Sequence, residues 1–488
     1  MDLSWRNATA PINRLPADVL LLLPDFWDTH ERNQKIIALT HVCRAWRQIF
    51  TSRSSLWVDI DCEDADKTRV YLERSRSSPI ILSLCRRDNL PPDDSFFQIT
   101  PHVIERLESL FVNGTPENLQ EITNSLSCPA PLLEDMAIIG GHRPWPEDDI
   151  PDLTPALFDG DLSSLCELRL KCVRTELPWR NMAALTSFTL VGTSPVSVGH
   201  LLDFLESAPR LQDVELCFEI STSGAAEDGR LVSLAHLRFM SIKDGSSSVL
   251  LDHLLIPVGA DLTVLVDLPR PTTEHPRFLD NLRNLSDFTA IKLNSGYRPQ
   301  IEFRGPNGKV TMALTTEAAL GRGTCLTLGF LAQFDTSKTE WLRIDFSGLP
   351  PSHPHHTILP MKNLRTLELH QCETPHDFIH ALDPSKSPSG FMLCPKLEAL
   401  VIISEATFVK DVVGMAAARK VGGGRHSTLL GSLAGGGGPN VCYLMRWNSR
   451  VTSLIWNGVM DGGNNEEAWR NRWDIGTPEQ QISPSVVR

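Results

Sequence analysis

Apolar residues recur in a fixed short pattern along the middle of the chain. The pattern is apolar-x-x-apolar-x-apolar, and it begins at Leu107, Leu133, Leu165, Leu185, Leu211 and Leu237. The last positions of these segments are separated by 26, 32, 20, 26 and 26 residues. Alternate residues of a strand point to the same face, so the last two apolar residues of each segment would enter one core. The pattern therefore predicts a series of short strands, each buried on one face.

Later segments continue this arrangement. Further strands are predicted at 262–266, 288–293, 310–314 and 341–344, and at the returning pattern that begins at Leu364 and Leu397. Residues 198–207 and 247–255 predict helices, each followed closely by a proline. The spacing of the pattern is near that of leucine-rich repeats, so we expect an irregular leucine-rich-repeat solenoid over residues 61–430. A generic α/β domain with coincidental leucine spacing is the alternative.

The N-terminal region has a helical period instead. Pro16 suits the first position of a helix, and Asp18 adds favourable negative charge to the first turn. Val19, Leu20 and Leu23 form one apolar stripe, until Pro24 ends the helix. We expect a helix of about two turns.

A second apolar stripe follows a polar, turn-like segment at 25–33. Val42, Trp46, Ile49 and Phe50 have the spacing of one helical face and predict a helix over 40–52. Three short helices bury little apolar surface alone, so exposed apolar residues here need a partner or the following domain. The alternative is an ordinary helical subdomain whose apolar residues form only its core.

The spaced elements of this region resemble the F-box, a helical module that docks onto the Skp adaptor of a ubiquitin ligase. They are Leu15-Pro16, Val19-Leu20, Val42-Cys43-Arg44-Ala45-Trp46 and Leu56-Trp57, in the order of the family. The resemblance implies a three-helix F-box at residues 12–60. It also implies partner-binding residues drawn from Leu15, Pro16, Val19, Leu20, Val42, Cys43, Trp46, Leu56 and Trp57. One departure is Leu23-Pro24, where the family often has Ile-Phe.

The fold class expected from both halves is α/β, with the F-box followed by the repeat solenoid. This layout is similar to the large group of fungal F-box proteins over about residues 12 to 425. Residues 1–11 would form an N-terminal tail. Residues 431–488 are rich in glycine and acidic residues and would form a loose tail, with a strand at 451–456 and tryptophans that cap the solenoid.

Composition narrows the classes of partner. The chain has 488 residues, 41% hydrophobic and 22% charged, which is typical of a folded protein. Its net charge is −13 without a basic run, which argues against nucleic acid and anionic membranes as partners. The start of the chain has no secretory signal, so we expect a cytoplasmic or nuclear protein. Eleven cysteines without a Cys-x-x-Cys pair indicate reduced, mostly buried thiols.

Catalytic and metal-binding motifs are weak. Two histidine groups lack the paired cysteines of structural zinc sites: His353, His355 and His356 form one, and His370, Cys372, His376 and His380 form the other. Gly305 to Lys309 lacks the spacing of a P-loop and is better explained by a turn between strands. We therefore expect no cofactor, no metal and no enzymatic activity.

The predicted function is the substrate-recognition adaptor of a cullin-RING ubiquitin ligase. Its F-box would bind the Skp-type adaptor and the cullin core, and its repeats would bind a protein target that the sequence does not identify. A non-ligase binding scaffold built from the same two parts is the first alternative. A hydrolase or metal enzyme within the long domain is the second.

Overall fold

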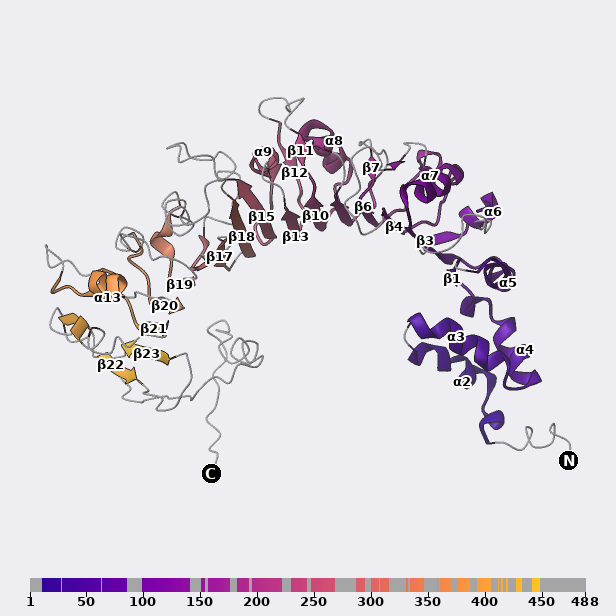
Figure 1. Cartoon of the computed structure of the whole chain (residues 1–488), viewed down its shortest axis with the longest axis horizontal. Helices are drawn as coiled ribbons and strands as arrows, with labels where there is room; N and C mark the ends of the chain where they lie inside the picture. The colour runs from indigo at the N-terminus through magenta and orange to yellow at the C-terminus, as the bar shows by residue number, and fades with distance from the viewer. Residues whose placement is uncertain are drawn as a thin grey trace. The chain divides into compact units, whose positions relative to one another are not determined.

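The computed structural model divides the chain into two compact units. Unit 1 comprises Met1–Phe288 and Glu302–Glu317, and unit 2 comprises Thr289–Ile301 and Ala318–Arg488. The described residues are 11–27, 29–62, 64–85, 99–140, 151–153, 157–175, 182–192, 195–221, 230–243, 247–267, 287–294, 300–306, 308–315, 331, 334–345, 358, 360–370, 376–386, 393–404, 411, 414–415, 418–419, 427–431 and 441–447. Figure 1 draws the elements in these ranges.

Short helices open unit 1. They are the 3-10 helices η1 (Pro11–Arg14), η2 (Leu23–Phe26) and η3 (Ser54–Leu56) and the α-helices α2 (Ala17–Leu21), α3 (Thr29–Thr40) and α4 (Arg44–Ser52). As predicted, α2 ends before Pro24, which lies inside η2. The turn predicted at 25–33 is wrong, because α3 already begins at Thr29. A Glu31–Lys35 ion pair of 2.5 Å, one helical turn apart, stabilises that polar first half.

A parallel sheet forms the body of unit 1. Its strands in spatial order are β1 (Asp59–Asp61), β2 (Ile80–Cys85), β3 (Leu107–Asn113), β4 (Asp135–Ile139), β6 (Glu167–Lys171), β8 (Ser187–Val191), β10 (Asp213–Cys217), β13 (Phe239–Ile242), β15 (Asp261–Asp267) and β18 (Gly308–Thr315). Each strand pairs in parallel with the next one in this order. The strands predicted from the apolar pattern are therefore confirmed.

The register of this sheet aligns the apolar pattern from strand to strand. One buried row runs through Leu110, Met136, Leu168, Phe188, Val214, Met240, Leu262 and Val310. A second buried row lies two residues further along each strand, at Val112, Ile138, Leu170, Leu190, Leu216, Ile242, Val264 and Met312. Because a one-residue slip would turn every one of these side chains to the other face, burial of the rows specifies the register.

Helices and small strand pairs connect the strands of unit 1. The helices are α5 (Ala65–Ser75), α6 (Pro101–Ile104), α7 (Pro116–Ser125), α8 (Val198–Ser207) and α9 (Ser247–Leu251), with the 3-10 helix η5 (Leu157–Gly160). The small parallel pairs are β5 (Asp152–Leu153) with β7 (Arg174–Thr175), β9 (Val196–Ser197) with β11 (Ile220–Ser221), and β12 (Val232–Ser233) with β14 (Leu254–Leu255). Figure 1 shows α7, α8 and α9 on the same side of the sheet. The helix predicted at 198–207 is confirmed, and Ser197 caps it by accepting from the His200 N–H at 3.3 Å.

Unit 2 contains a mixed sheet. Strands β16 (Ala290–Asn294), β19 (Trp341–Asp345), β20 (Thr366–His370) and β21 (Ala399–Ser404) are parallel, whereas β23 (Val441–Trp447) runs antiparallel to β21 and to β22 (Ser427–Gly431). The 3-10 helix η7 (Thr336–Lys338) and helix α13 (His376–Leu382) also lie in it, and β17 (Gln300–Gly305) spans the boundary between the units. Strand β23 was not predicted, since it lies in the segment expected to be a loose tail. The strand predicted at 451–456 lies outside the described residues.

The predicted architecture, an N-terminal three-helix F-box followed by an irregular leucine-rich-repeat solenoid, is wrong. The described residues form large, mostly parallel sheets with few helices, which is an α/β fold. Residues 12–60 divide into short α and 3-10 segments that belong to the same unit as the first sheet. The physical reason is that the apolar pattern specifies only a strand with alternate residues buried, and strands of this kind occur in many sheet architectures besides a leucine-rich-repeat solenoid. The domain boundaries placed at residues 12, 61 and 431 stay predictions.

Candidate binding surfaces

An exposed apolar surface lies on the N-terminal helices. It consists of Ile12, Leu15, Val19, Leu22, Phe26 and Val42, which are all exposed, and we call it the apolar surface. Phe26 is the extreme case, with 83% of its area accessible. Scattered exposed leucines are ordinary in proteins, but several large exposed apolar residues in one small helical segment make a candidate interaction surface.

The opposite side of the same helices forms a core. Leu20, Ile36, Trp46 and Phe50 are buried, and the Trp46 and Phe50 rings lie 5.9 Å apart. Helix α2 therefore carries apolar residues on both sides, with Leu20 turned inward and Val19 turned outward. Val19 therefore stays exposed beside the core that Leu20 enters.

The closing Leu56 and Trp57 anchor the helices to the sheet domain. Both are buried, and the Trp57 indole N–H donates to the Phe50 carbonyl at 2.9 Å. The Trp57 ring also meets Tyr71 edge to face at 4.9 Å and lies 4.3 Å beneath the Arg74 guanidinium, both on α5. These contacts explain why the helical segment belongs to unit 1.

The predicted partner-binding residues therefore fall into two groups. Leu15, Pro16, Val19 and Val42 are exposed and Cys43 is half-buried, whereas Leu20, Trp46, Leu56 and Trp57 are buried. A partner can touch the first group directly, while the second group shapes the surface from beneath. Their role in binding a partner stays a prediction.

Three exposed residues were not predicted as partner-binding. They are Ile12, Leu22 and Phe26. A signal for two of them was present, because Leu15, Val19, Leu22 and Phe26 recur at intervals of four, three and four residues. This is a second apolar stripe beside the one that contains Leu20. Buried Pro24 is the second residue of the 3-10 helix η2, and Phe26 is its last residue.

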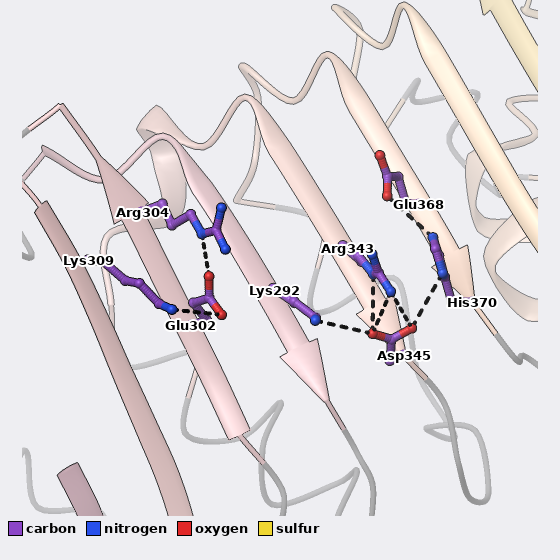
Figure 2. A network of polar contacts seen from close by, with 8 residues as sticks. All are labelled: Lys292, Glu302, Arg304, Lys309, Arg343, Asp345, Glu368 and His370. Atoms are coloured by element: carbon purple, nitrogen blue, oxygen red, sulfur yellow. Dashed lines mark hydrogen bonds and ion pairs between the residues drawn. The ribbon is translucent and has the colours of Figure 1, made fainter. Parts of the chain in front are cut away.

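A second candidate surface is the polar face of the unit 2 sheet. Figure 2 shows Asp345 on β19 beside Arg343, Lys292 and His370. Arg343 Nη2 lies 3.1 Å and Lys292 Nζ 3.8 Å from Asp345 Oδ2, and His370 Nδ1 lies 3.6 Å from Oδ1. All four side chains are largely shielded from water, so these interactions are stronger than those of exposed ion pairs.

Glu368 extends this polar cluster. Its carboxylate lies 3.3 Å from His370 Nε2 and accepts a 3.0 Å hydrogen bond from the Trp341 indole N–H. Burial works against ionisation of the Glu368 carboxyl, but the contacts with His370 and Trp341 prevail and hold its pKa below the ordinary value. The positive and negative groups of the cluster compensate one another, which suits a recognition or structural role.

A smaller ion-pair group lies at the end of unit 1. Glu302 on β17 pairs with Arg304 and, at 3.7 Å, with Lys309 on β18, as Figure 2 shows. The turn predicted between strands at Gly305 to Lys309 is confirmed, since β17 ends at Gly305 and β18 begins at Gly308. Gly308 has a φ of 115°, a conformation that glycine adopts without steric cost.

The two histidine groups show no metal site within the described part of the chain. His353, His355, His356 and Cys372 lie outside it, and His370 is engaged by carboxylates. Across the described ranges, no group of three or more His, Cys, Asp or Glu side chains is placed to hold a metal ion.

The cysteines that the structure describes are free thiols, mostly half-buried. Burial raises the pKa of Cys62 to about 12 and that of Cys394 to about 12, so both are poor nucleophiles at neutral pH. The expectation of reduced thiols is consistent with these groups.

Neither a membrane-spanning helix, within the described residues, nor a match to a known family or curated protein is found for this chain. Among the described residues, no helix combines the length and apolar character that crossing a bilayer requires. The chain matches no model of a known protein family and no curated protein.

Proposed function

We propose that this protein is the target-recognition subunit of a cullin-RING ubiquitin ligase. The apolar surface would dock onto a Skp-type adaptor bound to the cullin core, and the polar sheet face would hold a protein target. The exposed apolar surface carries this proposal, because several large apolar side chains stay in contact with water unless a partner covers them.

The geometry of the N-terminal helices supports a groove-binding mode. Leu15, Val19 and Leu22 lie on or next to the short helix α2, and Leu20 locks that helix onto its own core. Short amphipathic helices bind by inserting such side chains into an apolar groove. Each side chain that becomes fully buried contributes about 1.5–3 kcal/mol. The resemblance of residues 12–57 to the adaptor-binding motif agrees with this mode.

The sheet face provides the second contact. Its outward positions carry polar and charged side chains, such as Arg343, Glu368 and His370, held by one another in defined positions. Polar groups that are fixed in advance give specificity to a protein contact at a low entropic cost. In this proposal the protein catalyses no reaction itself, and ubiquitin transfer follows from proximity of the target, in the cytoplasm or nucleus.

Adaptor capture tests the proposal. The full chain and a Leu15→Asp/Val19→Asp variant are each mixed with a purified Skp-type adaptor, and the bound fraction is measured. Both changes lie on the surface, so the variant should fold but lose binding at least about tenfold. A Val258→Asp variant, which changes an exposed valine of the sheet domain, should bind like wild type. Equal capture of wild type and the double variant contradicts the proposal.

A non-ligase scaffold is the second candidate function. It is favoured by one observation: Pro24 lies where the resembling family often has an aromatic residue, and α2 has only five residues. If the adaptor binds but no cullin joins the complex, and target turnover does not depend on ubiquitin, the scaffold replaces the ligase.

A further inference from the structure

Residues 32–58 contain five Arg or Lys residues and no Asp or Glu. This is unusual in a chain with 59 acidic and 46 basic residues. Two of the cations are paired with carboxylates that precede the segment, Arg32 with Asp25 at 3.5 Å and Lys35 with Glu31 at 2.5 Å. The other three cations of this segment are Arg44 and Arg47 on α4 and Arg53 directly after it.

Arg44, Arg47 and Arg53 make no ion pair within the described residues, and neither does Arg14 beside α2. All four are exposed. Arg47 donates from Nε to the Thr40 carbonyl at 3.0 Å, which fixes the side chain without neutralising its charge. Four uncompensated guanidinium groups therefore lie on one small helical segment.

Two of these arginines, Arg14 and Arg44, lie close in the chain to residues of the apolar surface. Arg14 precedes Leu15 in the chain, and Arg44 follows Val42 by two residues. Helix α4 buries Trp46 and Phe50, so Arg44 and Arg47, three residues apart, share the side that points away from the core. Helix α2 packs against α4, which brings the apolar and cationic residues into one region.

We propose that the partner surface which covers the N-terminal helices is an acidic protein surface with an apolar centre. This inference rests on the proposed function and adds the charge of the partner to it. Arginine pairs with carboxylates through two parallel hydrogen bonds, so each exposed guanidinium supplies a directional contact at the rim. An acidic partner also agrees with the lack of carboxylates at residues 32–58, since like charges facing one another oppose binding.

Single-stranded nucleic acid is the competing class of ligand for exposed arginines. The structure favours a protein, because every residue of the apolar surface except Phe26 is aliphatic and provides no stacking platform for bases.

Salt and charge reversal test the inference on the full-length protein and a purified Skp-type adaptor. Association rates and affinities are measured at ionic strengths of about 0.1 M and about 1 M, between which the screening length falls from about 10 to 3 Å. We expect wild-type affinity to fall at least about tenfold at high salt, mainly through the association rate. Arg44→Glu/Arg47→Glu should lower affinity at least about tenfold at low salt and remove most of the salt dependence.

Two controls keep the test specific. Arg210→Glu/Arg238→Glu reverses two exposed arginines of the sheet domain and should bind like wild type. Arg44→Lys/Arg47→Lys keeps the charge and should retain most of the salt dependence.

The outcomes separate this inference from the proposed function. If the adaptor binds and its affinity changes neither with salt nor with charge reversal, the inference is wrong and the proposed function stands. Absence of wild-type binding overturns both. Binding of a short single-stranded RNA that Arg44→Glu/Arg47→Glu abolishes, with adaptor binding unchanged, also overturns the inference.

Discussion

The Trp341 indole N–H donates a 3.0 Å hydrogen bond to Glu368 Oε1 across the pair of strands β19 and β20. This bond links the outward face of the unit 2 sheet to the cluster around His370 and Asp345. A charged acceptor makes it stronger than a neutral hydrogen bond, by a factor of about two. The face is therefore a connected network of side chains.

Acid should weaken unit 2 through Glu368. Its pKa in the folded protein is below the ordinary glutamate value of 4.5, so the stabilisation is present above that value and is lost as pH falls through the folded pKa. Glu368→Gln should lower the free energy of unfolding by about 1–3 kcal/mol at neutral pH and by less below pH 4.5. Urea titrations of both proteins across this range measure the difference. Trp341→Phe removes the indole donor to Glu368, so the free energy of unfolding of this variant should also change less with pH than that of wild type. A difference in the free energy of unfolding between Glu368→Gln and wild type that stays constant with pH would show that ionised Glu368 is not its cause.

Gly140 should tolerate no side chain. A Cβ at this position would lie 2.2 Å from the Cys172 carbonyl oxygen, because the Gly140 N–H donates to the Lys171 carbonyl at 2.7 Å on the neighbouring strand. Both atoms belong to the backbone, so Gly140→Ala should cost about 1–3 kcal/mol in the free energy of unfolding. Gly114→Ala is the matched control, since its nearest contact would be an ordinary 3.4 Å to the Asn118 Cβ. Equal urea midpoints for the two variants would refute the close approach.

The buried guanidinium of Arg106 should stabilise the fold through its hydrogen bonds. It is buried and donates to the Ser78 carbonyl from Nε at 3.1 Å and from Nη2 at 2.9 Å, and to the Ser75 hydroxyl at 2.7 Å. Arg106→Met keeps much of the volume but leaves these acceptors without their donor, which should cost about 1.5–3 kcal/mol. Arg106→Lys should recover only part of this loss, because an ammonium cannot reproduce the fork of donors. Thermal unfolding compares the three proteins, and a Met variant as stable as wild type would rule out this role.

Substitutions of the adjacent residues Val19 and Leu20 on α2 should affect different properties, adaptor binding for Val19 and stability for Leu20. Leu20→Ala removes a buried side chain and should cost about 2–5 kcal/mol in the free energy of unfolding. Val19→Ala changes an exposed side chain and should alter stability by less than about 0.5 kcal/mol. Adaptor binding should fall for Val19→Ala at unchanged stability. A destabilised Val19→Ala would mean that the valine packs inside the protein.

Local apolar periodicity predicted much of the secondary structure. The strands that begin at Leu107 and Asp135 and the helix at 198–207 follow from residue spacing, since burial of alternate residues leaves a direct mark on the sequence. The first half of helix α3 was mistaken for a turn because it is polar; an ion pair stabilises it. Strand β23 was missed because glycines precede it, and its pairing with β21 depends on residues about 40 positions earlier.

The candidate surface was only partly predictable. Leu15 and Trp46 belong to the same sequence motif, yet the first is exposed and the second is 3% accessible. A motif lists the residues that occur together without saying which of them face a core. Phe26 was overlooked because the first stripe was assumed to end at Pro24.

By itself, the sequence determined most of the strands with alternating apolar residues, the helix at 198–207, and that the N-terminal helices carry more apolar residues than they can bury. These are local properties, set by the period with which side chains alternate between water and a core. Only the tertiary structure decided that the strands join into mostly parallel sheets, that Trp57 ties the helices to the first of them, and that Lys292, Asp345 and His370 meet on one face. Such contacts join residues far apart in the chain, and their energies depend on burial and distance, which no linear spacing contains.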